Sequence, residues 1–133
     1  MFSESIARNH DYGGVAMQNI PPQVQALLGQ LESYQQQIQL VIQQKQRVQV
    51  ELNDAKKALE EIEKTEEGIP IYKTVGTLIV KSTKSKALEE VKEKVETLEV
   101  RLKALERQEQ KLNEKIKELT RQIQSALRGG VAG

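Results

Sequence analysis

The sequence predicts a mainly α-helical protein: a long antiparallel two-helix coiled coil with a β-hairpin at the hinge. Two apolar heptad seams, in residues 22–66 and 84–127, have the same number of repeats. Between them, residues 69–81 form the one stretch with strand-like chemistry. The composition agrees, because 29% charged and 3% aromatic residues are typical of an elongated helical assembly and not of a globular core.

The first helix is expected to begin at Pro21 and Pro22, because proline fits the first turn of a helix and no later one. Six unbroken heptads then indicate a coiled coil. The a and d positions of this seam are Val24, Leu27, Leu31, Tyr34, Ile38, Val41, Lys45, Val48, Leu52, Ala55, Leu59 and Ile62. Gly68 is a natural helix stop, and Pro70 follows it closely.

The second helix is expected to begin after Ser82 or Thr83, either of which could cap it. It also carries six heptads. The seam positions are Leu88, Val91, Val95, Leu98, Leu102, Leu105, Glu109, Leu112, Ile116, Leu119, Ile123 and Ala126. Gly129 and Gly130 are expected to fray the helix, so residues 129–133 are predicted to be a disordered tail.

The two seams match in mirror order about the hinge. If Ile62 faces Leu88, the register continues to Val24 facing Ala126, and every layer pairs an a position with a d position. Lys45 and Glu109 then fall in adjacent layers, close enough to pair. We interpret them as a pair that sets the register and not as catalytic groups, because no third polar group on the seam would complete a site.

The hinge is predicted to be a β-hairpin formed by residues 71–75 and 77–81 around Gly76. An isolated two-stranded hairpin is marginally stable, and its unpaired edges invite other strands. We therefore expect hairpins from several subunits to join into a β-barrel platform; the alternative is a monomer whose hairpin folds onto its own coil. The candidate oligomerisation residues are Ile71, Tyr72, Val75, Gly76, Leu78, Ile79 and Val80.

The free ends of the two helices carry apolar residues beyond the seam, Ile20, Leu28 and Leu127. Exposed apolar side chains gathered there suggest a binding surface, although they could instead close the end of the coil or broaden its seam. Residues 17–50 contain 12 Gln and three charged residues. This polar, nearly uncharged surface is either a solvated helix face or a surface suited to varied ligands.

Several classes of protein are disfavoured. Without cysteine there are no disulfides, no Cys-ligated zinc and no thiol catalysis, which fits a cytoplasmic protein. With no phosphate-binding loop, metal-spaced cluster or nucleophile beside a base, we expect no enzyme activity, no cofactor and no direct use of ATP. A net charge of +1 argues against nucleic-acid binding, and no apolar run approaches the ~18 residues that cross a membrane.

The first sixteen residues match nothing that follows. They lack a helical period and a secretory signal, and they hold His10, the single histidine. We interpret residues 1–16 as a disordered leader or start extension, with Met17 as a natural start; a binding arm is the alternative.

Two heptad arms joined by one hairpin with the sequence IYKTVGTLIVK resemble the beta class of the prefoldin family. The run TLEVRLKALERQEQKLNEKIKEL in the second arm looks like archaeal members. The resemblance covers about residues 17–127. Alpha-class subunits have two hairpins at this place, and the connector here, residues 63–87, has room for one.

The resemblance implies a cytosolic, ATP-independent chaperone in a hexamer of two alpha and four beta subunits, with the hairpins in a double β-barrel platform. It also implies that the tips hold non-native polypeptides and deliver them to a group II chaperonin. The residues that would contact a client are Ile20, Val24, Leu27, Leu28, Leu119, Ile123 and Leu127.

Two other functions are compatible with a helical hairpin. An RNA-binding arm would need basic residues gathered near the tip. Arg121 and Arg128 lie near the second helix end, but the outer half of the first helix has only Lys45 and Arg47. The other function is a passive coiled-coil scaffold, which should not respond to unfolded proteins.

Overall fold

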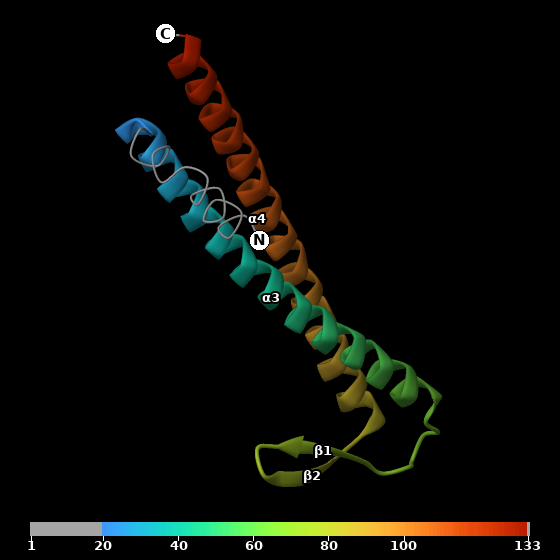
Figure 1. The fold of residues 1–133 in the computed structure, drawn as a ribbon. Coiled ribbons are helices and arrows are strands. Elements are labelled where there is room, and N and C mark those ends of the chain that lie inside the picture. The colour runs from blue at the N-terminus through green and yellow to red at the C-terminus, as the bar shows by residue number, and fades with distance from the viewer. Residues whose placement is uncertain (1–19, 133) are drawn as a thin grey trace. The chain divides into compact units, whose positions relative to one another are not determined.

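The computed structural model describes residues 20–132 and confirms the predicted fold class (Figure 1). The expected leader 1–16 and the expected start at Met17 lie outside the described residues. The chain divides into two compact units. The tip unit comprises the described residues up to Val41 and from Gln108 on, and the hinge unit is Ile42–Arg107. In chain order the elements are α3 (Pro22–Lys64), β1 (Ile71–Val75), β2 (Leu78–Ser82) and α4 (Lys84–Ala132).

Both helices begin where the sequence predicts. Pro22 is the first residue of α3, and the carbonyl of Pro21 accepts a hydrogen bond from the Val24 amide at 3.0 Å. At the start of α4, Thr83 is the cap of the two candidates: its hydroxyl accepts a hydrogen bond from the Lys86 amide at 3.2 Å. Each contact satisfies an amide that the first turn of a helix leaves without an intrahelical partner.

The first helix ends at Lys64, two residues before the expected end at Glu66. A turn follows, in which the amide of Ile69 donates to the carbonyl of Glu66 at 3.3 Å. Gly68 occupies the third position of this turn with a φ of 87°, as a type II turn requires. The glycine thus serves the turn after the helix and is not itself the helix cap.

The second helix is longer than expected. It extends to Ala132, where the apolar pattern led us to expect an end at Leu127. Among the described residues positive φ occurs at Gly68 and Gly76, so Gly129 keeps a right-handed backbone. Glycine weakens a helix but does not terminate it unless it adopts the left-handed conformation.

The hairpin has a two-residue turn. Val75 pairs with Leu78, which leaves Gly76 and Thr77 as the central residues. Gly76 has a φ of 60°, and no described non-glycine residue has a positive φ, which identifies a type II′ turn. The second strand is therefore Leu78–Ser82, one residue later than the expected 77–81, because Thr77 is needed in the turn.

The core of the tip unit consists of seam residues from both helices. Val24 and Leu31 of α3 are each 1% exposed, and they cluster with Leu119 and Ile123 of α4. Half-buried apolar residues pack against this cluster, namely Ile20, Leu27, Leu28, Tyr34, Ile116 and Ala126. The pairing of the beginning of α3 with the end of α4 is the antiparallel arrangement that the mirror-matched seams predict.

The hinge unit also has a seam between α3 and α4. Its buried residues on the two helices are Val48, Leu52, Ala55, Ala87, Val95, Leu98 and Leu105. Nearest the hairpin, the seam residues Leu59, Ile62, Leu88 and Val91 are half-buried. All the predicted seam positions in both units are buried or half-buried, including Lys45 and Glu109, whose mutual pairing stays a prediction.

Candidate protein-interaction surfaces

The β1–β2 hairpin presents two faces with different surroundings. The antiparallel register places Ile71, Lys73 and Val75 on the same face as Leu78, Val80 and Ser82, which we call the inner face. Tyr72, Thr74, Ile79 and Lys81 form the outer face. Ile71 and Ser82 are half-buried, so the inner face is the one turned toward the helices at its base.

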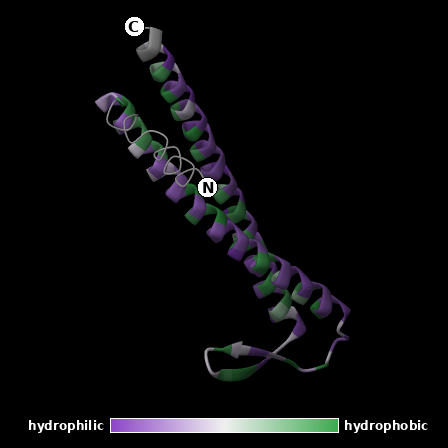
Figure 2. Cartoon of the chain, viewed as in Figure 1, coloured by the Kyte–Doolittle hydropathy of each residue, from purple (hydrophilic) through white to green (hydrophobic). Residues whose placement is uncertain are grey.

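Most of the predicted oligomerisation residues are exposed in this single chain. Figure 2 shows apolar residues along β2. The exposed fractions are 62% for Tyr72, 53% for Val75, 65% for Leu78, 71% for Ile79 and 38% for Val80. Ile71 is half-buried, and Gly76 forms the turn. So many large apolar side chains on two short strands form a surface that water solvates poorly.

One ion pair joins a strand to a helix among the described residues. Lys73 Nζ of β1 lies 2.9 Å from Oε1 and 3.1 Å from Oε2 of Glu90 on α4. Both side chains remain partly exposed, at 43% and 51%. No local sequence pattern indicates this pair, because the two residues are 17 positions apart in the chain and meet only when the hairpin turns its inner face to α4.

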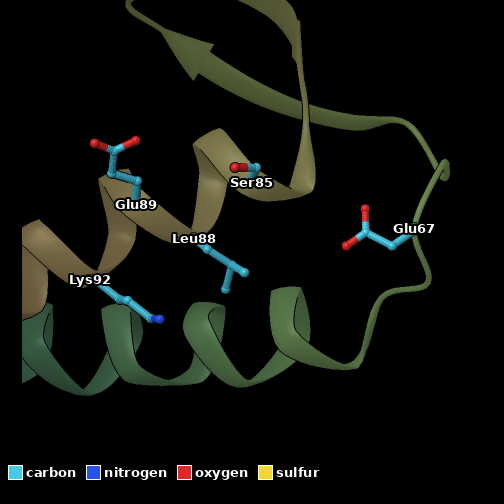
Figure 3. Close-up of a pocket in the computed structure, with 5 residues that line it drawn as sticks. All are labelled: Glu67, Ser85, Leu88, Glu89 and Lys92. Carbon is cyan, nitrogen blue, oxygen red and sulfur yellow. The ribbon is translucent and has the colours of Figure 1, made fainter.

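The base of the hinge holds further polar contacts and a shallow hollow. Lys84 Nζ donates to the carbonyl of Glu63 at 3.1 Å, which places a cation at the carboxyl end of α3, where the helix dipole favours it. The hollow, about 480 Å³, is lined by Glu67, Ser85, Leu88, Glu89 and Lys92 (Figure 3). Figure 3 shows Leu88 and Lys92 directed toward α3 and the Glu89 carboxylate pointing away from them, so the polar groups do not converge on one point.

The seven predicted client-binding residues occupy three environments in the tip unit. Val24, Leu119 and Ile123 are buried in the seam core. Ile20, Leu27 and Leu28 are half-buried, and Leu127 is 44% exposed. A partner could touch four of the seven without opening the coil. These are Ile20, Leu27, Leu28 and Leu127, which we call the tip patch.

Polar contacts order the tip unit around this patch. The side-chain amide of Gln25 donates to the carbonyl of Ile20 at 3.0 Å, which ties the residue before α3 to its first turn. Lys115 Nζ of α4 lies 5.1 Å from the centre of the Tyr34 ring on α3, within the range of a cation–π interaction. This contact across the two helices agrees with the predicted register, in which Tyr34 faces Ile116.

A second ion pair lies on α4 near the tip. Arg121 donates to both carboxylate oxygens of Glu118, at 2.6 and 3.1 Å, and Gln122 donates to Oε1 at 3.1 Å. The hydrogen bonds from Arg121 and Gln122 lower the pKa of Glu118 to about 2, and the bond to Glu118 raises the pKa of Arg121. The pair is therefore fully charged at neutral pH.

Several exposed apolar side chains lie outside both the hairpin and the tip patch. Leu40 is 59% exposed, Val50 60% and Val100 67%. They occupy heptad positions c and f, which face away from the seam, and apolar residues at those positions were the signal that could have identified them. They make useful control sites, because they share the chemistry of the tip patch and of the hairpin but not their location.

The described residues hold neither a membrane-spanning helix nor a cluster of metal ligands. Neither α3 nor α4 has an apolar stretch that could cross a membrane. Residues 20–132 also contain no group of three or more His, Cys, Asp or Glu side chains placed to hold a metal ion.

The chain is similar to prefoldin subunits. Residues 25–130 match the family of prefoldin subunits. Prefoldin subunit beta of Thermococcus onnurineus is 82% identical over 112 residues, covering 84% of this chain and 97% of that protein. Prefoldin subunit beta of Pyrococcus furiosus is 79% identical over 117 residues, covering 88% and 100%.

Solved structures agree with these sequence matches. The crystal structure of the prefoldin beta subunit from Thermococcus strain KS-1 has 76% sequence identity and a TM-score of 0.78, and the match covers 84% of this chain and 97% of that chain. The beta2 subunit of the same strain, at 18% identity and a TM-score of 0.62, shares the fold.

Proposed function

This chain belongs to the prefoldin subunit family, and from that premise we propose that it holds non-native polypeptides with its tip patch, without ATP, and passes them to a group II chaperonin. The observation that carries the proposal is the distribution of exposed apolar side chains. Five of them lie on the hairpin, and three, Leu40, Val50 and Val100, lie along the coil. At the tip Leu127 is exposed and Ile20, Leu27 and Leu28 are half-buried. A passive scaffold would need neither surface.

The hairpin supports the assembly half of the proposal. Its strands leave their outer edges unpaired and five large apolar side chains exposed, which edge-to-edge pairing with other hairpins would cover. The partners are further copies of this chain and alpha-class subunits, in the two-alpha, four-beta hexamer of the prefoldin family. In that arrangement the hairpins form the platform, and each tip unit stays available to a client.

The tip patch supports the capture half. Leu127 is exposed and Ile20, Leu27 and Leu28 are half-buried, so each chain offers a small apolar area. One such patch binds weakly, but several patches on one platform raise the effective concentration for a client that touches more than one. Weak contacts also allow release without nucleotide hydrolysis, because each patch can let go independently.

The RNA-binding alternative is less well supported by the tip unit. Arg121 is engaged by Glu118, and Lys115 lies over the Tyr34 ring, so two of its cations already have partners within the chain. Residues 20–44 add one charged residue, Glu32, which is acidic. A surface that recognises phosphates needs clustered cations with free donors.

The decisive experiment measures light scattering of a chemically denatured model protein diluted into buffer without ATP. We expect suppression by this chain alone or together with an alpha-class subunit at near-stoichiometric ratios. The matched control is Leu40→Ser, which removes an exposed leucine away from the tip patch and should suppress aggregation equally well. Absence of suppression in both the single-chain and the mixed sample contradicts the proposal, and salt-dependent RNA binding in its place would favour the RNA arm.

Delivery to the chaperonin needs its own measurement. A labelled client held by the assembled chain should move to an added group II chaperonin, and its refolded yield should rise once ATP is supplied to the chaperonin. Size-exclusion chromatography follows the label between the two complexes. A client that stays with this chain under those conditions would limit its role to holding.

A further inference from the structure

The hairpin has little apolar contact with its own helices. Of its large apolar side chains, Ile71 is half-buried at the base, and the other five are exposed. A two-stranded hairpin attached only at its two ends can pivot about those ends. Its direction relative to α4 must therefore come from something other than a shared hydrophobic core.

The Lys73–Glu90 ion pair acts at the right place to set that direction. Lys73 is the third of the five residues of β1, so the contact holds the middle of the strand and not one of its ends. Its Nζ lies within 3.1 Å of both carboxylate oxygens of Glu90. Glu90 belongs to the second turn of α4, which Thr83 caps and anchors.

The consequence is visible in the exposure of the two hairpin faces. On the inner face the exposed fraction rises from half-buried Ile71 and 38% for Val80, near the ion pair, to 65% for Leu78 beside the turn. On the outer face Tyr72 and Ile79 are 62% and 71% exposed. The face that carries Lys73 is thus the one turned to α4 at its base, and the other face is directed outward.

We propose that Lys73 and Glu90 are positioning residues that hold the hairpin in its assembly-competent direction before a partner subunit arrives. This inference rests on the proposed function, because the direction of the hairpin affects assembly only if the subunits assemble through their hairpins. The apparent affinity for a partner scales with the fraction of chains in the competent conformation. Loss of the pair therefore weakens assembly, and a substitution of Glu90 on α4 does so without changing any side chain of the hairpin.

The direct test measures the hairpin direction by pulsed electron paramagnetic resonance. The chain has no cysteine, so spin labels can be placed at Thr77→Cys in the turn and Arg101→Cys on α4, with labelled chains diluted into unlabelled ones. We expect a narrow distance distribution in the parent, a broad one in Lys73→Glu, and recovery in Lys73→Glu with Glu90→Lys. Lys103→Glu makes the same charge change on α4, away from the ion pair, and should leave the distance distribution narrow.

The second measurement is the affinity for an alpha-class subunit. Lys73→Glu should lower it about fivefold per subunit, the size expected when an exposed ion pair is lost, and the double reversal should restore most of it. Lys103→Glu should change it by less than about twofold. A matching loss in Glu90→Lys, with the same recovery in the double reversal, supports the pair as a unit.

Two results would overturn the proposal: distance distributions in Lys73→Glu that stay as narrow as the parent's, or broadened distributions with an affinity equal to that of Lys103→Glu. Failure of the proposed function has a different signature. In that case the parent does not assemble through its hairpin and Ile79→Asp, on the outer face, has no effect on its oligomeric state. The distance distributions then decide alone whether the pair sets the direction.

Discussion

The tip unit and the hairpin of the hinge unit contain similar apolar side chains but differ in how much of them is buried within the chain. In the tip unit Val24 and Leu31 are each 1% exposed, because α4 supplies the opposing half of every layer. In the hinge unit the hairpin leaves Leu78 and Ile79 65% and 71% exposed, because its own chain supplies no such partner. Burial within the chain stabilises the coil, and apolar surface left uncovered is available to other chains.

Loss of assembly is the strongest expected consequence of this contrast. Ile79→Asp places a carboxylate on the outer hairpin face, where its cross-strand partner is the uncharged Thr74, and burying an unpaired charge at an interface costs several kcal/mol. Affinity for partner subunits should fall at least about a hundredfold, while helix content is unchanged. Sedimentation velocity and circular dichroism measure the two effects.

The control for that variant is Val100→Asp, which introduces the same charge at a 67%-exposed position on α4. It should assemble like the parent. Normal assembly of Ile79→Asp would mean that the hairpin is not the assembly surface.

In the tip unit the largest effect is on folding stability. Leu31→Ala removes a fully buried side chain and should lower the free energy of unfolding by about 3 kcal/mol. Leu40→Ala, on the same helix but 59% exposed, should change it by less than about 0.5 kcal/mol. Urea unfolding followed by circular dichroism compares them; equal losses would refute the seam assignment.

The tip patch should affect client holding and not folding. Leu28→Ser combined with Leu127→Ser removes apolar area at one half-buried and one exposed position, so aggregation suppression should fall several-fold. The reduction is amplified because every patch on the platform weakens together. Sedimentation should show an intact oligomer; if the oligomer dissociates, the two leucines serve assembly or folding instead.

Two glycine-to-alanine substitutions, one in the hairpin turn and one in α3, should change stability by smaller amounts and in opposite directions. Gly76→Ala should destabilise the hairpin by about 1 kcal/mol, because the φ of 60° there disfavours any side chain. Gly29→Ala is the matched control and should stabilise α3 by about 0.5–1 kcal/mol, since alanine favours the helix and the added carbon would meet no atom within 4 Å beyond its chain neighbours and the adjacent helix backbone. Amide hydrogen exchange in each element distinguishes the two outcomes.

The smallest expected effect is a pH dependence near the tip. The pKa of Glu118 is lowered in the folded chain, from 4.5 to about 2, so its contact with Arg121 contributes fully above pH 4.5. The contribution is lost as the pH falls toward 2. Glu118→Gln should therefore lower the melting temperature slightly at pH 7 and leave it unchanged below pH 2. An equal difference at both pH values would contradict the assigned pair.

The helical part of the fold could be predicted from sequence because its information is local and periodic. Apolar residues spaced three and four apart specify which side of a helix is buried, and every predicted seam position is buried or half-buried. Proline at the start of α3 and Thr83 before α4 fix the helix starts by their own backbone chemistry. The end of α4 was placed too early, because glycine alone does not stop a helix.

The hairpin was predictable in kind but not in detail. Alternating β-branched residues on either side of Gly76 specify two strands, but the start of the second strand depends on which residues form the turn. The type II′ turn takes both Gly76 and Thr77, so β2 begins at Leu78. A one-residue shift of this kind is invisible to composition and changes the face on which each side chain lies.

What the sequence alone decides is the coiled-coil seam, the presence of one hairpin and the membership of the chain in a chaperone family. The tertiary structure adds which apolar residues remain uncovered and how the hairpin is directed. Exposure of Leu127 beside buried Ile123, or the meeting of Lys73 with Glu90, depends on the relative placement of segments that no local pattern encodes. Period and propensity act between near neighbours along the chain, whereas contacts across seventeen residues require the folded backbone to bring the groups together.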